Sequence, residues 1–259
     1  MIWILIAVLF VGGAVAYAIC GNLAARRFMR PHVAEGHNDV LVPLFLTAGV
    51  IYAVLVGFIV VAMWESYDAA HANTSEEASL LAPLYRQTMV MAPEKGAAMR
   101  VLIRDYAEEV TQDWTHFQVT GQGSPRARKT VDEMLRLYGT LTPATKVREI
   151  VAAQFLQNFS QLLLDRNKRL LQAAESLSWI MWLAAGGGGL VVVGMSFVLY
   201  MDRPAPQLVM TSVLAALIGV LLFTMAVFNH PFVGPLAISP EPFESTLKLF
   251  QQIDGDFAA

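Results

Sequence analysis

The chain alternates long apolar stretches with a polar, amphipathic middle. A helix needs roughly 20 apolar residues to cross a bilayer, because it rises about 1.5 Å per residue and the hydrocarbon core is about 30 Å thick. Stretches of about that length without a charged side chain run over Met1–Cys20, Val40–Trp64, Ser176–Met201 and Leu208–Phe228. We therefore predict four membrane-spanning helices, and we expect the first to stay uncleaved because it lacks the basic start of a secretory signal.

The residues between the second and third spans have the pattern of packed helices. After Trp64 the chain turns polar with no glycine, and with no proline before Pro83, so we expect one helix to leave the membrane and continue into water. Apolar side chains then recur at spacings of three and four as far as Leu177, which is typical of amphipathic helices, and no stretch alternates like a strand. Cap and proline signals for helix starts lie at Pro93, Ser124-Pro125 and Thr142-Pro143.

The predicted fold class is therefore an all-α membrane protein, with a helical extramembrane domain inserted between the second and third of its four transmembrane helices. The expected divisions are 1–64 for the first two spans and their basic connecting loop, 65–178 for the helical domain, 179–228 for the last two spans, and 229–259 for a proline-rich tail. Because of its prolines, we expect the tail from Asn229 to Phe243 to be non-helical and to lie at the membrane interface.

The distribution of charge supports this division and narrows the chemistry. Of the 18 Lys and Arg residues, 13 lie between Glu65 and Ser178, as do 14 of the 21 acidic residues. A net charge of −3 argues against a nucleic-acid partner, which calls for a basic surface. Cys20 is the only cysteine and the five histidines show no ligand spacing, so we expect no metal site and no cofactor.

The sidedness of the spans follows from the basic residues, since Lys and Arg favour the cytoplasmic face. The loops after the first and third spans share one face and carry Arg26, Arg27, Arg30 and Arg203. This places the middle domain outside, although a second group of cations near the third span argues the other way. That group consists of Arg166, Lys168 and Arg169.

Two groups of residues resemble a bacterial bestrophin-like membrane family of uncharacterised function. The first reproduces the pattern G…W..Y..A…EA..L..LYR with Gly57, Trp64, Tyr67, Ala70, Glu77, Ala78, Leu81, Tyr85 and Arg86. The second is similar to the family's tail motif and consists of Pro231, Phe232, Gly234, Pro240 and Phe243. The family often has an aspartate shortly before this motif, where the present chain has Asn229.

The resemblance implies a multi-pass protein of the bacterial plasma (inner) membrane. Bestrophins are pentameric anion channels, so it also implies a homo-oligomer in the lipid bilayer that passes small ions. Neither the hydrophobic neck pattern of bestrophins nor their acidic calcium clasp is recognisable in this sequence.

Candidates for an ion path lie on the second span. Glu65 and Asp68 are three residues apart where this helix leaves the membrane, and rings of such carboxylates favour cations. The alternative is a solvated helix end. A pore-facing stripe of small and hydroxyl residues would consist of Thr47, Gly49 and Gly57.

Two further features have a structural and a functional interpretation. The run Gly186, Gly187, Gly188 and Gly189 in the third span suits either close helix packing or a hinge. A stripe on the last helix of the middle domain is interpreted as solvent-facing rather than pore-lining. It consists of Gln154, Gln157, Gln161, Asp165 and Lys168.

No enzyme class finds support, because nucleophile elbows, phosphate loops and metal clusters are missing from the sequence. We expect that Glu77 and Arg86 orient helices inside the domain rather than bind a ligand. The two remaining hypotheses are an oligomeric ion channel with a pore around the second span, and a non-catalytic scaffold or sensor whose helical domain binds a partner.

Overall fold

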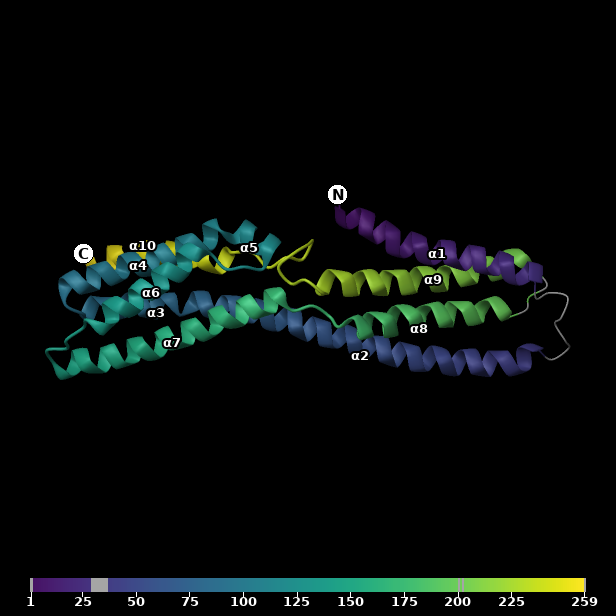
Figure 1. Ribbon diagram of the computed structural model, residues 1–259, viewed down its shortest axis with the longest axis horizontal. Coiled ribbons are helices and arrows are strands. Elements are labelled where there is room, and N and C mark those ends of the chain that lie inside the picture. The colour runs from purple at the N-terminus through teal and green to yellow at the C-terminus, as the bar shows by residue number, and fades with distance from the viewer. Residues whose placement is uncertain (1, 29–36, 200, 202, 259) are drawn as a thin grey trace. The chain divides into compact units, whose positions relative to one another are not determined.

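The computed structural model describes residues 2–28, 37–199, 201 and 203–258, and within these ranges it contains helices and no strand (Figure 1). The helices are α1 (Ile2–Phe28), α2 (His37–Ser79), α3 (Leu81–Gln87), the 3-10 helix η2 (Thr88–Val90), α4 (Pro93–Gln112), α5 (Trp114–Thr120), α6 (Pro125–Gly139), α7 (Lys146–Ala174), α8 (Trp179–Val198), α9 (Pro204–Phe228) and α10 (Glu241–Ala258). The all-helical prediction is confirmed for the described residues.

The chain divides into two compact units. The first consists of Met1–Ser66 with Ser176–His230, and the second of Tyr67–Glu175 with Pro231–Ala259. Among the described residues, four helices are long and apolar enough to cross a membrane, namely α1, α2, α8 and α9. Their existence is as predicted, and α2 continues without a break from the first unit into the second.

The first unit packs its four helices through small residues and leaves large apolar side chains outside. A Cβ on Gly219 of α9 would lie 2.8 Å from the Val11 Cα and 2.9 Å from the Phe10 carbonyl oxygen of α1. Two helix backbones therefore touch here, which small residues permit in membranes. Outward-facing side chains such as Leu9 and Val213 are more than half exposed, as a lipid-facing surface requires.

Polar contacts tie the helices of the first unit together at several levels. The Tyr52 hydroxyl donates to the Ala185 carbonyl oxygen at 3.0 Å, which joins α2 to α8. Arg26 of α1 donates to the Gln207 side-chain oxygen of α9 at 2.6 Å. The Leu177 N–H donates to the side-chain oxygen of Asn229 at 2.7 Å. Arg30, in the basic loop after the first span, lies outside the described residues.

The helix starts of the second unit follow local capping chemistry. Pro93 and Pro125 are the first residues of α4 and α6, and the Ser124 hydroxyl accepts from the Ala127 N–H at 3.4 Å, as predicted. The predicted start at Thr142-Pro143 is wrong. The cap of α7 is Thr145, whose hydroxyl accepts from the Arg148 N–H at 3.3 Å.

The prediction that residues 229–243 are non-helical is wrong for the last three of them, which begin α10. Proline is tolerated in the first turn of a helix, because the N–H it lacks has no helical partner there, and Pro242 occupies that turn. Before it, Gly234 has a φ of 116°, a conformation open to glycine. The Ile238 N–H closes the loop on the Pro231 carbonyl oxygen at 3.0 Å.

The tail supplies part of the core of the second unit. Phe243 and Phe250 are fully buried, and the ring of Phe250 stacks on Tyr85 with 4.2 Å between centroids. Residues from α2, α3, α4, α5, α6 and α7 complete this core. The unit is therefore assembled from two segments that are separated in the sequence by the last two spans.

Candidate functional site

Helix α2 has one packed and one unpacked face within the first unit. Tyr52, Val56 and Met63 are buried against the other helices. Residues on the opposite side of the helix are exposed, among them Thr47 and Gly57. A Cβ on Gly57 would have no neighbour within 4 Å. Large apolar side chains are also exposed along this face, among them Val50, Val54, Phe58 and Val61.

The carboxylates proposed for the end of the span lie on this same face of α2. Glu65 and Asp68 are both exposed, and within the described part of the chain neither has an ion pair or a hydrogen bond from its side chain. Gly49 differs from the other ion-path candidates, because it is partly buried and lies nearer to the packed side. The helix thus presents Thr47, Gly57, Glu65 and Asp68 outward.

The centre of the second unit is a buried ion pair. Arg169 of α7 donates to the two carboxylate oxygens of Glu77 in α2, at 2.6 Å and 3.0 Å, and the Tyr106 hydroxyl of α4 donates to the same carboxylate at 2.6 Å. All three side chains are at most 3 % exposed. Burial alone lowers the pKa of Arg169, but the charge and hydrogen bonds of Glu77 outweigh it and raise that pKa, so the guanidinium stays charged.

Aromatic rings surround this guanidinium. The Arg169 carbon Cζ lies 4.8 Å from the centroid of Phe117, 5.4 Å from Trp114 and 5.8 Å from Phe243, which are cation–π distances. The Trp114 ring N–H donates to the Ile238 carbonyl oxygen at 3.1 Å. The cage therefore fastens the loop after the fourth span to the centre of the second unit.

A more exposed polar cluster joins α3, α4 and α10. Arg104 lies 2.7 Å from a carboxylate oxygen of Asp254, and the Tyr85 hydroxyl donates to the same carboxylate at 2.9 Å. Burial raises the pKa of Tyr85. Beside the cluster is a depression of about 410 Å³, with Thr88, Arg100 and Asp254 in its lining.

Comparison with known proteins decides the family. Residues 12–243 match the bestrophin-like domain family. The chain belongs to this family. Its fold is similar to the crystal structure of a point mutant of a bacterial bestrophin homologue from Klebsiella pneumoniae, with a TM-score of 0.70 and 12 % identity over 95 % of this chain and 98 % of that chain. A comparison with curated proteins found no match.

The residues of the bestrophin-like motif occupy structural positions in both units. The Trp64 ring meets Phe228 edge-on at 5.4 Å in the first unit. In the second, the Tyr67 hydroxyl donates to the Leu236 carbonyl oxygen at 2.8 Å, and Phe232 is buried against Phe117 at 5.0 Å. Four further motif residues lie in the ion pair, the Tyr85 cluster and the closed loop described above, namely Glu77, Tyr85, Pro231 and Gly234.

Two expectations about charged side chains are corrected. Arg86 is exposed and so does not orient helices inside the domain, whereas Glu77 joins α2 to α7 through Arg169. Asp165 does not belong to a solvent-facing stripe, because its side chain is only 1 % exposed and accepts from Gln161 at 3.0 Å and Lys168 at 2.8 Å. Its neighbours Gln154 and Gln157 on α7 are exposed as expected.

The glycine run lies in an unbroken part of α8. A Cβ on Gly188 would lie 2.8 Å from the Tyr52 ring, and one on Gly189 would lie 2.8 Å from Ile218. Gly186 has nothing within 4 Å, and Gly187 has only a distant contact with a side chain of its own helix. Half of the run therefore permits close packing, and the other half has free space.

Sequence reasoning missed Arg169, Tyr106 and Asp254. All three come from segments distant in sequence from their partners, so no local spacing links them. The signal available was weaker: a buried carboxylate needs a partner, and Arg169 lies on the apolar side of α7 beside Leu162. In the described ranges, no three His, Cys, Asp or Glu side chains are grouped as metal ligands.

Proposed function

We propose that this protein assembles as a homo-oligomer in the bacterial inner membrane, with its second spans around a central axis that conducts small ions. The observation that carries the proposal is the outward face of α2. In the described residues of one chain nothing packs on Gly57, and the Glu65 and Asp68 carboxylates stay unpaired. Membership of the bestrophin-like family supports the proposal.

The selectivity proposed from these charges is for cations. In a ring of subunits Glu65 and Asp68 would form carboxylate rings at one mouth, where they would concentrate cations. This differs from the anion selectivity implied by the resemblance to bestrophins. The chain's own charges near the proposed path are negative, so we favour cations.

We also propose roles for the extramembrane domain, the other spans, the tail and the glycine run. We propose that residues 65–178 form an extramembrane domain on the external side, since the Arg26 and Arg203 loops favour the cytoplasm. The divisions at 1–64 and 179–228 then hold the paired spans, and the tail at 229–259 contributes Phe243 and Phe250 to the core of the second unit. Gly186 and Gly187, which no other helix crowds, are the part of the glycine run best suited to act as a hinge.

Recordings from purified protein in planar bilayers test the function. In a tenfold salt gradient, the reversal potential of a cation-selective pore lies up to about 59 mV from zero. Its sign shows whether cations or anions carry the current. The double variant Glu65→Gln with Asp68→Asn should move the reversal potential toward zero. The matched control is Glu241→Gln with Glu244→Gln, which removes two exposed carboxylates at the same spacing on α10.

Three results would contradict the proposal. If the wild-type protein conducts no ions, the proposal of a channel is wrong. If the reversal potential is unchanged in the double variant, the two carboxylates belong to a solvated helix end and do not line the ion path. A monomer in mild detergent without conductance favours the alternative, a scaffold or sensor whose helical domain binds a partner.

A further inference from the structure

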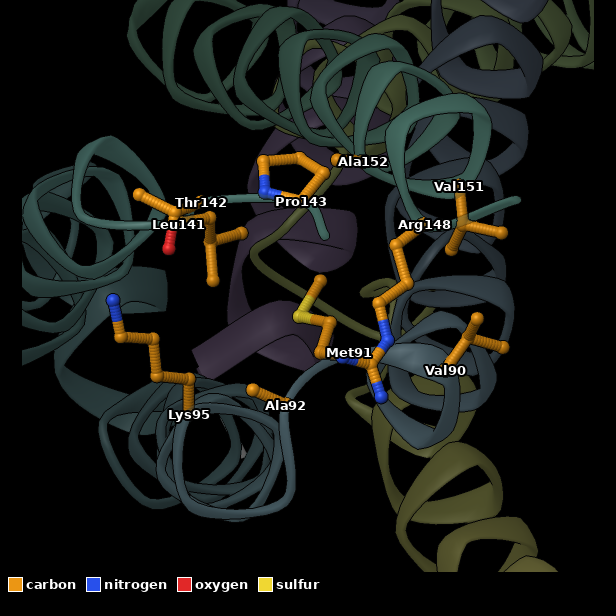
Figure 2. A pocket seen from close by; sticks show the side chains of 10 residues that line it. All are labelled: Val90, Met91, Ala92, Lys95, Leu141, Thr142, Pro143, Arg148, Val151 and Ala152. Atoms are coloured by element: carbon orange, nitrogen blue, oxygen red, sulfur yellow. The ribbon is translucent and has the colours of Figure 1, made fainter. Parts of the chain in front are cut away.

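A small cavity in the second unit lies between the start of α4 and the start of α7 (Figure 2). Its volume is about 60 Å³. Most of its wall is apolar, and the apolar side chains in that wall include Met91, Leu141 and Val151. Figure 2 shows Met91 in the middle of the view and Pro143 above it.

Two cations line this cavity, and no carboxylate does. Figure 2 shows Lys95 and Arg148 on opposite sides of Met91, with the Lys95 nitrogen turned away from Arg148. Lys95 Nζ donates to the Thr140 carbonyl oxygen. The Arg148 guanidinium has neither a hydrogen bond nor an ion pair with any residue that the structure describes. The cavity wall therefore carries positive charge, and the partly buried Arg148 guanidinium is available to bind an anion.

The surroundings strengthen this preference for an anion. Lys95 and Arg148 are each the third residue of their helices, α4 and α7, so the positive ends of two helix dipoles add to the side-chain charges. A guanidinium beside apolar groups gains most from a carboxylate, which accepts charge-assisted hydrogen bonds. Glu149, the acidic residue nearest in sequence to Arg148, is engaged by Lys146 at 3.0 Å.

The size and the apolar wall narrow the class of anion. A water needs about 15 Å³ of such volume, so a cavity of this size admits a small molecule and excludes a lipid or a folded partner. An ion without an apolar part, such as phosphate, would make no apolar contact with Met91 and Val151. A carboxylate with a short alkyl chain suits both the Arg148 guanidinium and the apolar wall.

We propose that this cavity binds a short-chain monocarboxylate, from acetate to butyrate in size. Its carboxylate pairs with the Arg148 guanidinium, and its alkyl chain lies against Met91, Leu141 and Val151. The site belongs to the second unit and does not depend on whether the protein conducts ions.

Titration calorimetry on the full chain in detergent tests the site, with butyrate, butylammonium and inorganic phosphate as probes. Butyrate should bind saturably with a dissociation constant on the order of 1 mM. It should bind at least tenfold more tightly than butylammonium or phosphate. Arg148→Gln should weaken butyrate binding at least tenfold, and Arg148→Lys less than that, because it keeps the charge. Val151→Phe should abolish binding by filling the cavity.

Arg126→Gln is the matched control, since Arg126 is an exposed arginine near the start of α6 and does not line the cavity. It should bind butyrate like the wild type, and circular dichroism should show equal helicity for all variants. Equal binding of butylammonium, phosphate binding as tight as butyrate, or unchanged binding by Arg148→Gln would each overturn the proposal. A lack of saturable butyrate binding would also overturn it.

Discussion

Arg169 holds the carboxylate of Glu77 with two hydrogen bonds, from Nε to Oε2 at 2.6 Å and from Nη2 to Oε1 at 3.0 Å. The two side chains are 3 % and 0 % exposed. A buried pair of this kind is costly to break, because a single remaining charge would lie in an apolar surrounding. It joins α7 to the end of α2 and thereby positions the aromatic cage.

Glu77→Gln should lower the free energy of unfolding by about 3–5 kcal/mol, since it leaves the Arg169 charge without its counter-ion. Chemical denaturation in detergent measures the change. Glu149→Gln is the matched control, because it breaks an exposed pair with Lys146 and should cost less than about 1 kcal/mol. Equal effects of the two variants would contradict a structural role for the buried pair.

The stability of the protein should fall in alkali through Tyr106. Burial, together with the charge of Glu77, raises the pKa of Tyr106 well above its usual value. Above about pH 10 the unfolded chain loses this proton while the folded chain keeps it, so the free energy of unfolding decreases by up to about 1.4 kcal/mol per pH unit. Below that pH the group contributes no such slope.

Tyr106→Phe should make the free energy of unfolding decrease less steeply in alkali. At neutral pH it should lower that free energy by about 1–3 kcal/mol, because the hydrogen bond from Tyr106 to Glu77 is missing. Denaturation curves at about pH 8 and about pH 11 measure both effects. If the wild type and the variant lose stability in parallel, the tyrosine does not cause the alkaline decrease.

Gly219→Ala should destabilise the first unit. The added methyl group would meet backbone atoms of Val11 and Phe10 on α1 at under 3 Å, and backbone cannot move aside as a side chain can. Gly186→Ala is the control in α8, where nothing lies within 4 Å, and it should be neutral or stabilise by up to about 1 kcal/mol. Thermal unfolding in detergent distinguishes them, and a neutral Gly219→Ala would show that α1 and α9 do not touch there.

Sidedness can be tested by cysteine labelling in intact cells, in a chain whose Cys20 is replaced by serine. Ser124 is unsuitable as a label site because it is buried as a helix cap, whereas its neighbour Gln122 is exposed. Gln122→Cys should react with an impermeant maleimide in intact cells, and Arg203→Cys only after lysis. The reverse pattern would place the second unit in the cytoplasm.

The sequence alone was sufficient for features that depend on neighbouring residues. Crossing a membrane requires a continuous apolar stretch, so hydropathy located the four spans. Helix starts at Pro93 and Pro125 follow from the missing proline N–H and the Ser124 hydroxyl, which act within one turn. The bestrophin-like motif was likewise readable, because its residues lie within two short segments.

Tertiary structure alone decided the contacts between distant segments. Glu77 and Arg169 are 92 residues apart, and Asp254 reaches Arg104 across 150. The Arg148 cavity likewise depends on how α4 and α7 start beside each other. Helical periodicity predicts that a face is buried, but it does not select the partner, because many pairings bury equal apolar area and only packing of the whole unit distinguishes among them.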